Sequence, residues 1–451
     1  MLKKFFLYIF FLITVVFING QVLNTSPFSR YGIGEINTIQ SAHYFGFGNI
    51  TSPSSEPQYI NINNPASYAS FIKNNPIYNV SLAGKSALYN SNYNNKETTS
   101  SGNNFGLNNL FMGLPITNNW GLVFGITPLS SQGYEVSSTV PFDTSTVDYI
   151  FKGDGSVNKL LIGNGFNILN KGDTTRISLG LNCSYLFGNL DRTSTVVYNN
   201  SNDYNSRVQY RSSLSGWGFD VGLQIFKRFK TASNNKLFLS LGVNYSLSSD
   251  ITTDNDFFAY TFKYNFSVQE FPKDTLAMEN ENSNMVLPEK LEFGLSFGKV
   301  YKNKRRWDFG AQYSSIDWTK FQDNSKYSSH SDFPMGAYWR ISLGYRLSPN
   351  LDWSNTNKSL LSKSTFCLGI HQTQSKIIVD KKSLIQNGIN FGVSIPLLSS
   401  RSLSRVNFGV EVGKLGDLTI NKIEENYFKF SIGFSLGPDT RYDRWFRKRK
   451  Y

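Results

Sequence analysis

One pattern repeats along most of this chain and restricts its fold more than any other feature. From about residue 76 onward, apolar residues alternate with small or polar residues over stretches of roughly ten positions, each followed by a polar link. Residues 237–247 are typical, because Leu239, Leu241 and Val243 share one face while Ser240 and Gly242 share the other. A period of two residues is the signature of β-strands, so the pattern predicts an all-β protein.

Strand length separates the two architectures that show this alternation. A soluble antiparallel sandwich turns its apolar face inward, whereas a transmembrane barrel turns it outward to lipid. Soluble strands average about 5–6 residues, but a tilted membrane strand needs about 9–11. The stretches in this chain have the greater length. We therefore predict a transmembrane antiparallel β-barrel over residues 76–437, with about 14 strands.

Charged residues lie on the polar face of several predicted strands. In a barrel this face lines the lumen, where opposite charges on neighbouring strands can pair. The lumen candidates are Asp220, Glu292, Asp308, Arg340, Arg346, Glu411 and Lys429. We expect the two arginines to pair with lumen acids such as Glu292 and Glu411; binding of a carboxylate ligand is the alternative. Four long polar stretches, residues 91–104, 199–207, 271–287 and 322–334, are predicted as extracellular loops.

The two ends of the chain differ from the strand series. Lys3 and Lys4 precede an apolar run, residues 5–18, that is shorter than the roughly 20 residues of a membrane-spanning helix. This predicts a signal peptide over residues 1–20, with a retained anchor as the alternative, and a location in the outer membrane of a Gram-negative cell. Residues 438–451 are rich in arginine and lysine, and we expect a basic periplasmic tail.

The sequence offers little for catalysis, metal binding or nucleic-acid binding. It has three histidines and two cysteines, and none forms a cluster with zinc-like spacing. His371 lies within a predicted strand without a nucleophile motif near it, and no G-x-S-x-G motif occurs in a strand-to-helix context. The basic residues are scattered or gathered in the tail. We expect no enzyme activity, no cofactor, no metal and no nucleic-acid partner.

Residues 21–75 precede the strand series and contain the tripeptide Asn64-Pro65-Ala66. This tripeptide, its position shortly before the first strand, and residues 287–294, 307–321, 338–346 and 407–413 resemble the FadL-type outer-membrane transport family, the long-chain fatty acid transporters. The resemblance implies a 14-stranded barrel with an N-terminal hatch, residues 21–75, folded inside the lumen. Hydrophobic ligands would enter at the outer loops, rest in an apolar pocket, and leave when the hatch shifts.

Candidate hatch residues follow from the resemblance. Asn64, Pro65 and Ala66 are gate candidates; a local turn fixed by the proline and the asparagine side chain is the alternative. Four aromatic residues are candidates for hatch contacts, and ordinary packing is the alternative for each. They are Phe45, Phe47, Tyr59 and Tyr68.

Two functions remain open at this point. The first is an outer-membrane transporter or channel for hydrophobic small molecules such as long-chain fatty acids, gated by the hatch. The second is a FadL-like barrel that does not transport, and instead serves as an interaction or scaffold subunit of a protein secretion system of the type IX kind. The first predicts a hydrophobic ligand and outer-membrane lipid as partners, and the second a periplasmic or secretion-system protein.

Overall fold

The computed structural model describes residues 26–39, 41–93, 96–143, 145–172, 174–199, 203–231, 235–264, 270–326, 335–351, 359–379, 381–397 and 404–437. The predicted signal peptide and the basic tail therefore lie outside the described residues. Among the described residues, no helix reaches the length and apolar character that a membrane crossing requires.

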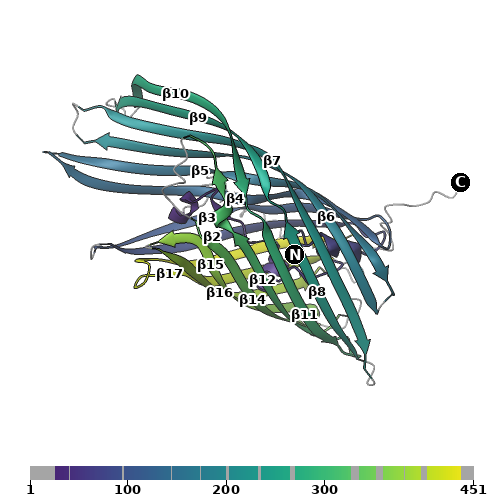
Figure 1. Ribbon diagram of the computed structural model, residues 1–451. Helices are drawn as coiled ribbons and strands as arrows, with labels where there is room; N and C mark the ends of the chain where they lie inside the picture. The colour runs from purple at the N-terminus through teal and green to yellow at the C-terminus, as the bar shows by residue number, and fades with distance from the viewer. Residues whose placement is uncertain are drawn as a thin grey trace, which may run out of the picture.

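The described residues form one antiparallel sheet that closes on itself as a barrel (Figure 1). Its strands are β2 (Ile77–Tyr93), β3 (Lys96–Pro115), β4 (Trp120–Phe142), β5 (Ser145–Asn170), β6 (Thr175–Tyr198), β7 (Asn205–Lys230), β8 (Lys236–Ser246), β9 (Ser249–Tyr264), β10 (Glu270–Leu287), β11 (Lys290–Val300), β12 (Arg306–Asp317), β14 (Ala337–Ser348), β15 (Thr365–Val379), β16 (Lys382–Pro396), β17 (Arg405–Asp417) and β18 (Ile423–Leu436). The last strand, β18, pairs with the first, β2, and closes the circle.

The described strands give the barrel 14 positions around its wall. β8 and β9 both pair with β7 and act as one strand interrupted at residues 247–248. β10 and β11 likewise act as one interrupted strand: β10 pairs with β9, and β11 pairs with β8. Two short strands remain: β1 (Glu35–Ile36) pairs with β4, and β13 (Gln322–Asp323) pairs with β10. The predicted all-β fold and its count of about 14 strands are confirmed.

The alternation predicted from the sequence sets which side chains face lipid. Leu241 is 41% exposed on the outside of β8, whereas its neighbour Ser240, on the inside, is 3% exposed. An apolar exterior that continues from strand to strand is the surface that a bilayer requires, because each backbone group is already paired within the closed sheet.

The predicted loops at residues 91–104 and 271–287 are wrong. Apart from residues 94–95, which are outside the described range, the first belongs to β2 and β3, and the second belongs to β10. β4 to β7 are 23 to 26 residues long, far beyond the 9–11 that cross a membrane. Their surplus extends as long hairpins past the other strands at one end of the barrel (Figure 1). A strand surrounded by water needs no apolar face, so its sequence does not alternate and is easily taken for a loop.

Residues 26–39 and 41–76 lie inside the barrel. They contain η1 (Pro27–Arg30), β1, α2 (Ala42–Gly46) and η2 (Pro65–Ser70). α2 packs on β15 to β18, and η2 packs on β3 to β7. The segment therefore contacts the inner surface of the wall in two separate regions. Wall glycines allow its backbone to approach closely, since a Cβ at any of them would overlap a backbone atom of this segment. They are Gly121, Gly165, Gly180, Gly242, Gly344, Gly369, Gly392 and Gly409.

Candidate functional site

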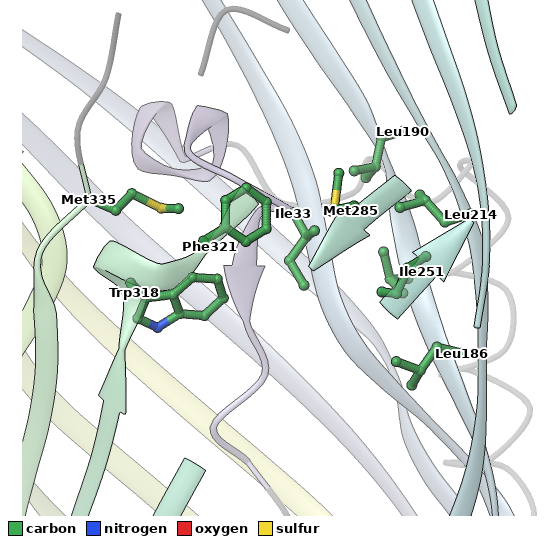
Figure 2. Close-up of a cluster of buried hydrophobic side chains, with 10 residues drawn as sticks. Ile33, Leu186, Leu190, Leu214, Ile251, Met285, Trp318, Phe321 and Met335 are labelled. Carbon is green, nitrogen blue, oxygen red and sulfur yellow. The ribbon is translucent and has the colours of Figure 1, made fainter. Parts of the chain in front are cut away.

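An apolar cluster occupies part of the lumen next to the N-terminal segment (Figure 2). Ile33, from the turn before β1, lies between leucines of the wall and the aromatic rings of Trp318 and Phe321. Trp318 belongs to η3 (Trp318–Lys320), a single turn after β12 that brings its ring inside the barrel, where it is 5% exposed. The full cluster comprises Ile33, Val157, Leu186, Leu190, Leu214, Ile251, Met285, Trp318, Phe321 and Met335.

A cavity of about 310 Å³ lies beside this cluster, and we call it the inner cavity. Ile33, Leu186 and Trp318 of the cluster contribute to its apolar wall. Several charged side chains also line it, including the sequence candidates Asp220, Glu292, Arg340 and Lys429. An apolar wall with a few placed polar groups is the usual make-up of a small-molecule site.

Lys376 is the charged group of the inner cavity that differs from the others. Its side chain is buried, and its ammonium lies 4.1 Å from the centroid of the Trp318 ring. The ammonium donates hydrogen bonds to the carbonyls of Tyr31 (3.3 Å) and Gly34 (3.1 Å). It has no carboxylate partner within ion-pair distance among the described residues, and the nearby Glu35 is bound to Lys85. At contact distance its positive charge therefore meets two carbonyls and an aromatic face, and the Glu35 carboxylate acts on it from further away.

The other charges of the inner cavity are engaged with protein groups. Lys159 pairs with Asp220 at 2.8 Å, and Lys290 pairs with Glu292 at 2.9 Å. Arg340 donates to Ser342 on its own strand. Lys429 lies 3.9 Å from Glu35. Glu411, which does not line the inner cavity, accepts from Asn390 at 2.6 Å.

The barrel wall opens between β3 and β4. These strands pair only from Leu110 with Ile126 to Pro115 with Gly121, although both continue far beyond this point. The opening holds a second cavity of about 380 Å³, the seam cavity, lined by Asn104, Asn108 and Thr127. Unpaired strand edges at membrane depth are tolerated only where they face protein or water.

Residues 35–39 of the N-terminal segment cross this opening from the inside, and we call them the strap. Glu35 and Ile36 pair with Ser131 and Ser130 of β4. Asn37 donates to the side-chain oxygen of Asn108 on β3 at 2.9 Å, and Glu35 binds Lys85 of β2 at 2.9 Å. Residues 35–38 line both cavities, so the strap is the partition between them.

The Asn64-Pro65-Ala66 tripeptide lies away from both cavities. Asn64 caps η2 by accepting from the Ala66 amide at 3.1 Å, and its amide donates to the Ser52 carbonyl at 2.8 Å. Pro65 packs against Gly180 of the wall. Asn64 thus makes a local turn contact together with contacts to the wall, and the choice between a turn and a role in gating remains a prediction.

The four aromatic candidates are buried and line neither cavity. Tyr59 stacks on His43 with 3.7 Å between ring centroids, and the Tyr68 hydroxyl donates to Asn182 of β6. Phe47 lies under the Arg346 guanidinium at 4.8 Å, and Phe45 packs against Gly409 of β17. Their contacts hold the segment against the wall.

A buried ionic cluster joins the segment to the wall. Arg346 of β14 binds both Glu56 of the segment and Asp308 of β12, the latter at 2.7 Å. Arg306 adds a second cation, 3.0 Å from Asp308. Burial alone would raise the pKa of Glu56, but Arg346 and Arg306 outweigh it and hold this pKa below its ordinary value. Arg346 therefore serves the protein's own carboxylates.

Lys376 and Glu56 are not among the residues that the sequence predicts, and the signals for them are weak. Lys376 lies at an irregularity in the pairing of β15 and β16 between Gln374 and Ile378, where the strand alternation is lost. Glu56 sits in the non-strand segment, whose internal structure no periodic pattern reveals. Only the broken alternation around Lys376 could have drawn attention to it.

Comparison with known proteins gives a family and a fold. The family model described as BamG matches residues 1–451. No curated protein matches the chain. Similar solved structures include the toluene transporter TodX of P. putida, at 14% identity and a TM-score of 0.53, covering 89% of this chain and 99% of that one. The toluene transporter TbuX of Ralstonia pickettii has 11% identity and a TM-score of 0.52, over 88% and 97% of the two chains. A Pseudomonas aeruginosa FadL homologue has 11% identity and a TM-score of 0.50, over 90% and 99%. The fold is FadL-like.

Proposed function

The chain belongs to the BamG family, and we propose that it is an outer-membrane barrel that binds and transfers hydrophobic small molecules carrying an anionic head group, such as long-chain fatty acids. The single observation that supports this ligand class is Lys376, a buried ammonium without a described carboxylate partner, set beside the apolar wall of the inner cavity. A carboxylate would neutralise it, and an alkyl chain would lie along Ile33 and Trp318. Toluene, for which the similar transporters are named, is uncharged. The ligand proposed for this chain differs from toluene in its anionic head group.

Residues 26–76 act as the hatch in this proposal, and only part of the hatch moves. Its body is held by the glycine contacts and by the ionic cluster of Arg346. The strap is held by a few hydrogen bonds and by ion pairs of Glu35 with Lys85 and Lys429, and it lies between the inner cavity and the seam cavity. Displacement of the strap would join the two cavities into one route that leaves sideways between β3 and β4.

Replacing Lys376 tests the ligand class. For wild type, native mass spectrometry of the detergent-solubilised protein should show dodecanoate binding about tenfold or more tightly than dodecanol, since a charge-assisted hydrogen bond contributes roughly 1.5–3 kcal/mol. Lys376→Met should remove this preference and leave dodecanol binding unchanged. Lys320→Met is the matched control, because Lys320 is an exposed lysine paired with Glu289.

Two results would contradict the ligand class. Equal binding of dodecanol and dodecanoate to wild type would point to uncharged ligands. Binding of neither, together with co-purification of a protein partner in fixed ratio, would favour the interaction barrel of a secretion system instead.

Locking the strap tests the route. Ile36 and Ser130 are paired residues of antiparallel strands, whose Cα separation of about 4.5–5.5 Å suits a disulfide. In Ile36→Cys/Ser130→Cys, oxidation should slow the release of bound dodecanoate into lipid vesicles at least about tenfold, and a reductant should restore it. The control pair, Phe391→Cys/Val410→Cys, joins β16 to β17 within the intact wall, away from both cavities, and should change nothing. Unchanged release from the oxidised strap variant would place the route elsewhere.

A further inference from the structure

A row of polar side chains lines one side of the inner cavity, on the neighbouring strands β8, β11, β12 and β14 (Figure 1). Asn244 of β8 is paired with Glu292 of β11, and Glu292 is paired with Ser314 of β12. Ser314 is in turn paired with Arg340 of β14. Paired residues lie at one level of a sheet, with about 4.7–4.9 Å from strand to strand, so these four side chains share one level of the cavity wall. We call them the polar row.

Several atoms of the polar row are buried without a hydrogen-bond partner among the described residues. Arg340 donates from Nε to Ser342 at 3.1 Å, but its Nη2 has no partner. Glu292 accepts at Oε1 from Ser314 at 3.0 Å, but its Oε2 has none, and the side-chain oxygen of Asn244 has none either. Arg340, Glu292 and Asn244 are at most 6% exposed. Buried polar groups are nearly always hydrogen-bonded in native proteins, so the row needs a further group in the cavity beside it.

The hatch adds one more amide to the same cavity. Asn49 lines the inner cavity and is buried, and neither end of its side-chain amide has a partner among the described residues. Its φ of 59° lies in the left-handed region, which asparagine adopts more readily than most residues. Two residues further on, the Thr51 amide donates to the side chain of Gln312 at 2.7 Å, and Gln312 lies on the same face of β12 as Ser314. Asn49 is therefore near the polar row.

The unmatched atoms of the row suit a group that both donates and accepts. Nη2 of Arg340 is a donor and Oε2 of Glu292 is an acceptor, and they do not reach each other, since each is without a partner. A carboxylate would accept from the guanidinium, but it would leave Glu292 unmatched and would be repelled by it. A hydroxyl donates to Glu292 and accepts from Arg340 at the same time, and its second lone pair is free to accept from the Asn49 amide.

We propose that the polar row binds a hydroxyl group of the ligand, well separated from its anionic head group. This inference rests on the proposed function, in which Lys376 binds the head group. On β15, Thr373 is paired with Arg340, and Lys376 lies three residues further along the strand. At about 3.3 Å per residue, Lys376 is no more than about 10 Å along the wall from the level of the row. A fatty acid with a hydroxyl near the far end of its chain would reach both sites.

Hydroxylated ligands test the polar row. In native mass spectrometry of the detergent-solubilised wild type, 10-hydroxydecanoate should bind about tenfold more tightly than decanoate, because its hydroxyl bonds to two charged groups. 2-Hydroxydecanoate has the same composition, but its hydroxyl lies beside the carboxylate, so it should bind like decanoate. Equal binding of all three acids, with decanoate still preferred to decanol, would overturn this inference alone. Equal binding of decanoate and decanol would contradict the proposed function, and this inference with it.

Asn49→Gly tests the row with little risk to folding, because it removes a side chain without a described hydrogen bond and glycine accepts the left-handed backbone. The variant should reduce the preference for 10-hydroxydecanoate over decanoate about threefold or more, and Arg340→Met should abolish it. Asn74→Gly makes the same change at an exposed hatch residue with a φ of 61° that lines neither cavity, and the preference should persist. If Asn49→Gly and Asn74→Gly behave alike, the hydroxyl does not bind at the row and the inference is wrong.

Discussion

Gly242→Val is expected to abolish formation of the closed barrel with its hatch in place. A side chain at Gly242 would overlap the carbonyl oxygen of Ser52. This oxygen belongs to the backbone, so it cannot move aside by a change of rotamer. Close-packed interiors do not absorb such an overlap by small shifts, and a backbone displacement here would also break the Ser240 and Gln224 hydrogen bonds to Pro53 and Ser52. We expect a loss of more than about 4 kcal/mol, seen as loss of the compact, heat-modifiable band on a gel.

Gly106→Val is the matched control for this substitution. Gly106 also lies in a barrel strand, β3, but a Cβ there meets nothing within 4 Å. The same change in volume and β-propensity should leave the folded band intact. If the two variants behave alike, the glycines are required by the strands themselves, and the hatch is not held by close backbone contact.

The strand series was predictable because the physics of a bilayer acts on every second residue. In β8, β11 and β14 the outer face must be apolar and the inner face small or polar, so the period of two is visible without the structure. The same rule stops at the lipid boundary. β10 continues past it into water, where both faces can be polar, and the sequence of residues 271–287 therefore wrongly predicts a loop.

The candidate site was much less predictable, since it depends on contacts between residues far apart in the sequence. The charges Asp308 and Arg346 could be placed in the lumen from their strand positions, but the partner Glu56 lies in a segment without periodicity. Lys376 differs from Lys159 and Lys290 only in what faces it, a ring and two carbonyls in place of a carboxylate. Neither composition nor residue spacing shows which groups face each lysine in the folded barrel.

Arg346→Met is expected to destabilise the protein by about 3–5 kcal/mol, the cost of leaving buried carboxylates without their cation. Glu56 and Asp308 would then share the single guanidinium of Arg306, at 3.4 and 3.0 Å. Urea-induced unfolding in detergent micelles measures the loss. Arg211→Met is the control, because Arg211 pairs with Asp191 on an exposed part of the wall, and such a pair contributes about 0–1 kcal/mol.

The pH dependence distinguishes a lost ion pair from lost packing. In wild type the pKa of Glu56 is lowered, so its carboxylate contributes stability above the unfolded pKa of about 4.3, and this contribution is lost as the pH falls through the folded value. In Arg346→Met the pKa of Glu56 should be raised and not lowered, because burial without the cation favours the neutral acid. Acidification should then reduce the difference in the free energy of unfolding between this variant and wild type. Glu56→Gln added to Arg346→Met should recover part of the loss. A gap that stays constant with pH would mean that Arg346 supports the hatch by packing on Phe47 and not by its charge.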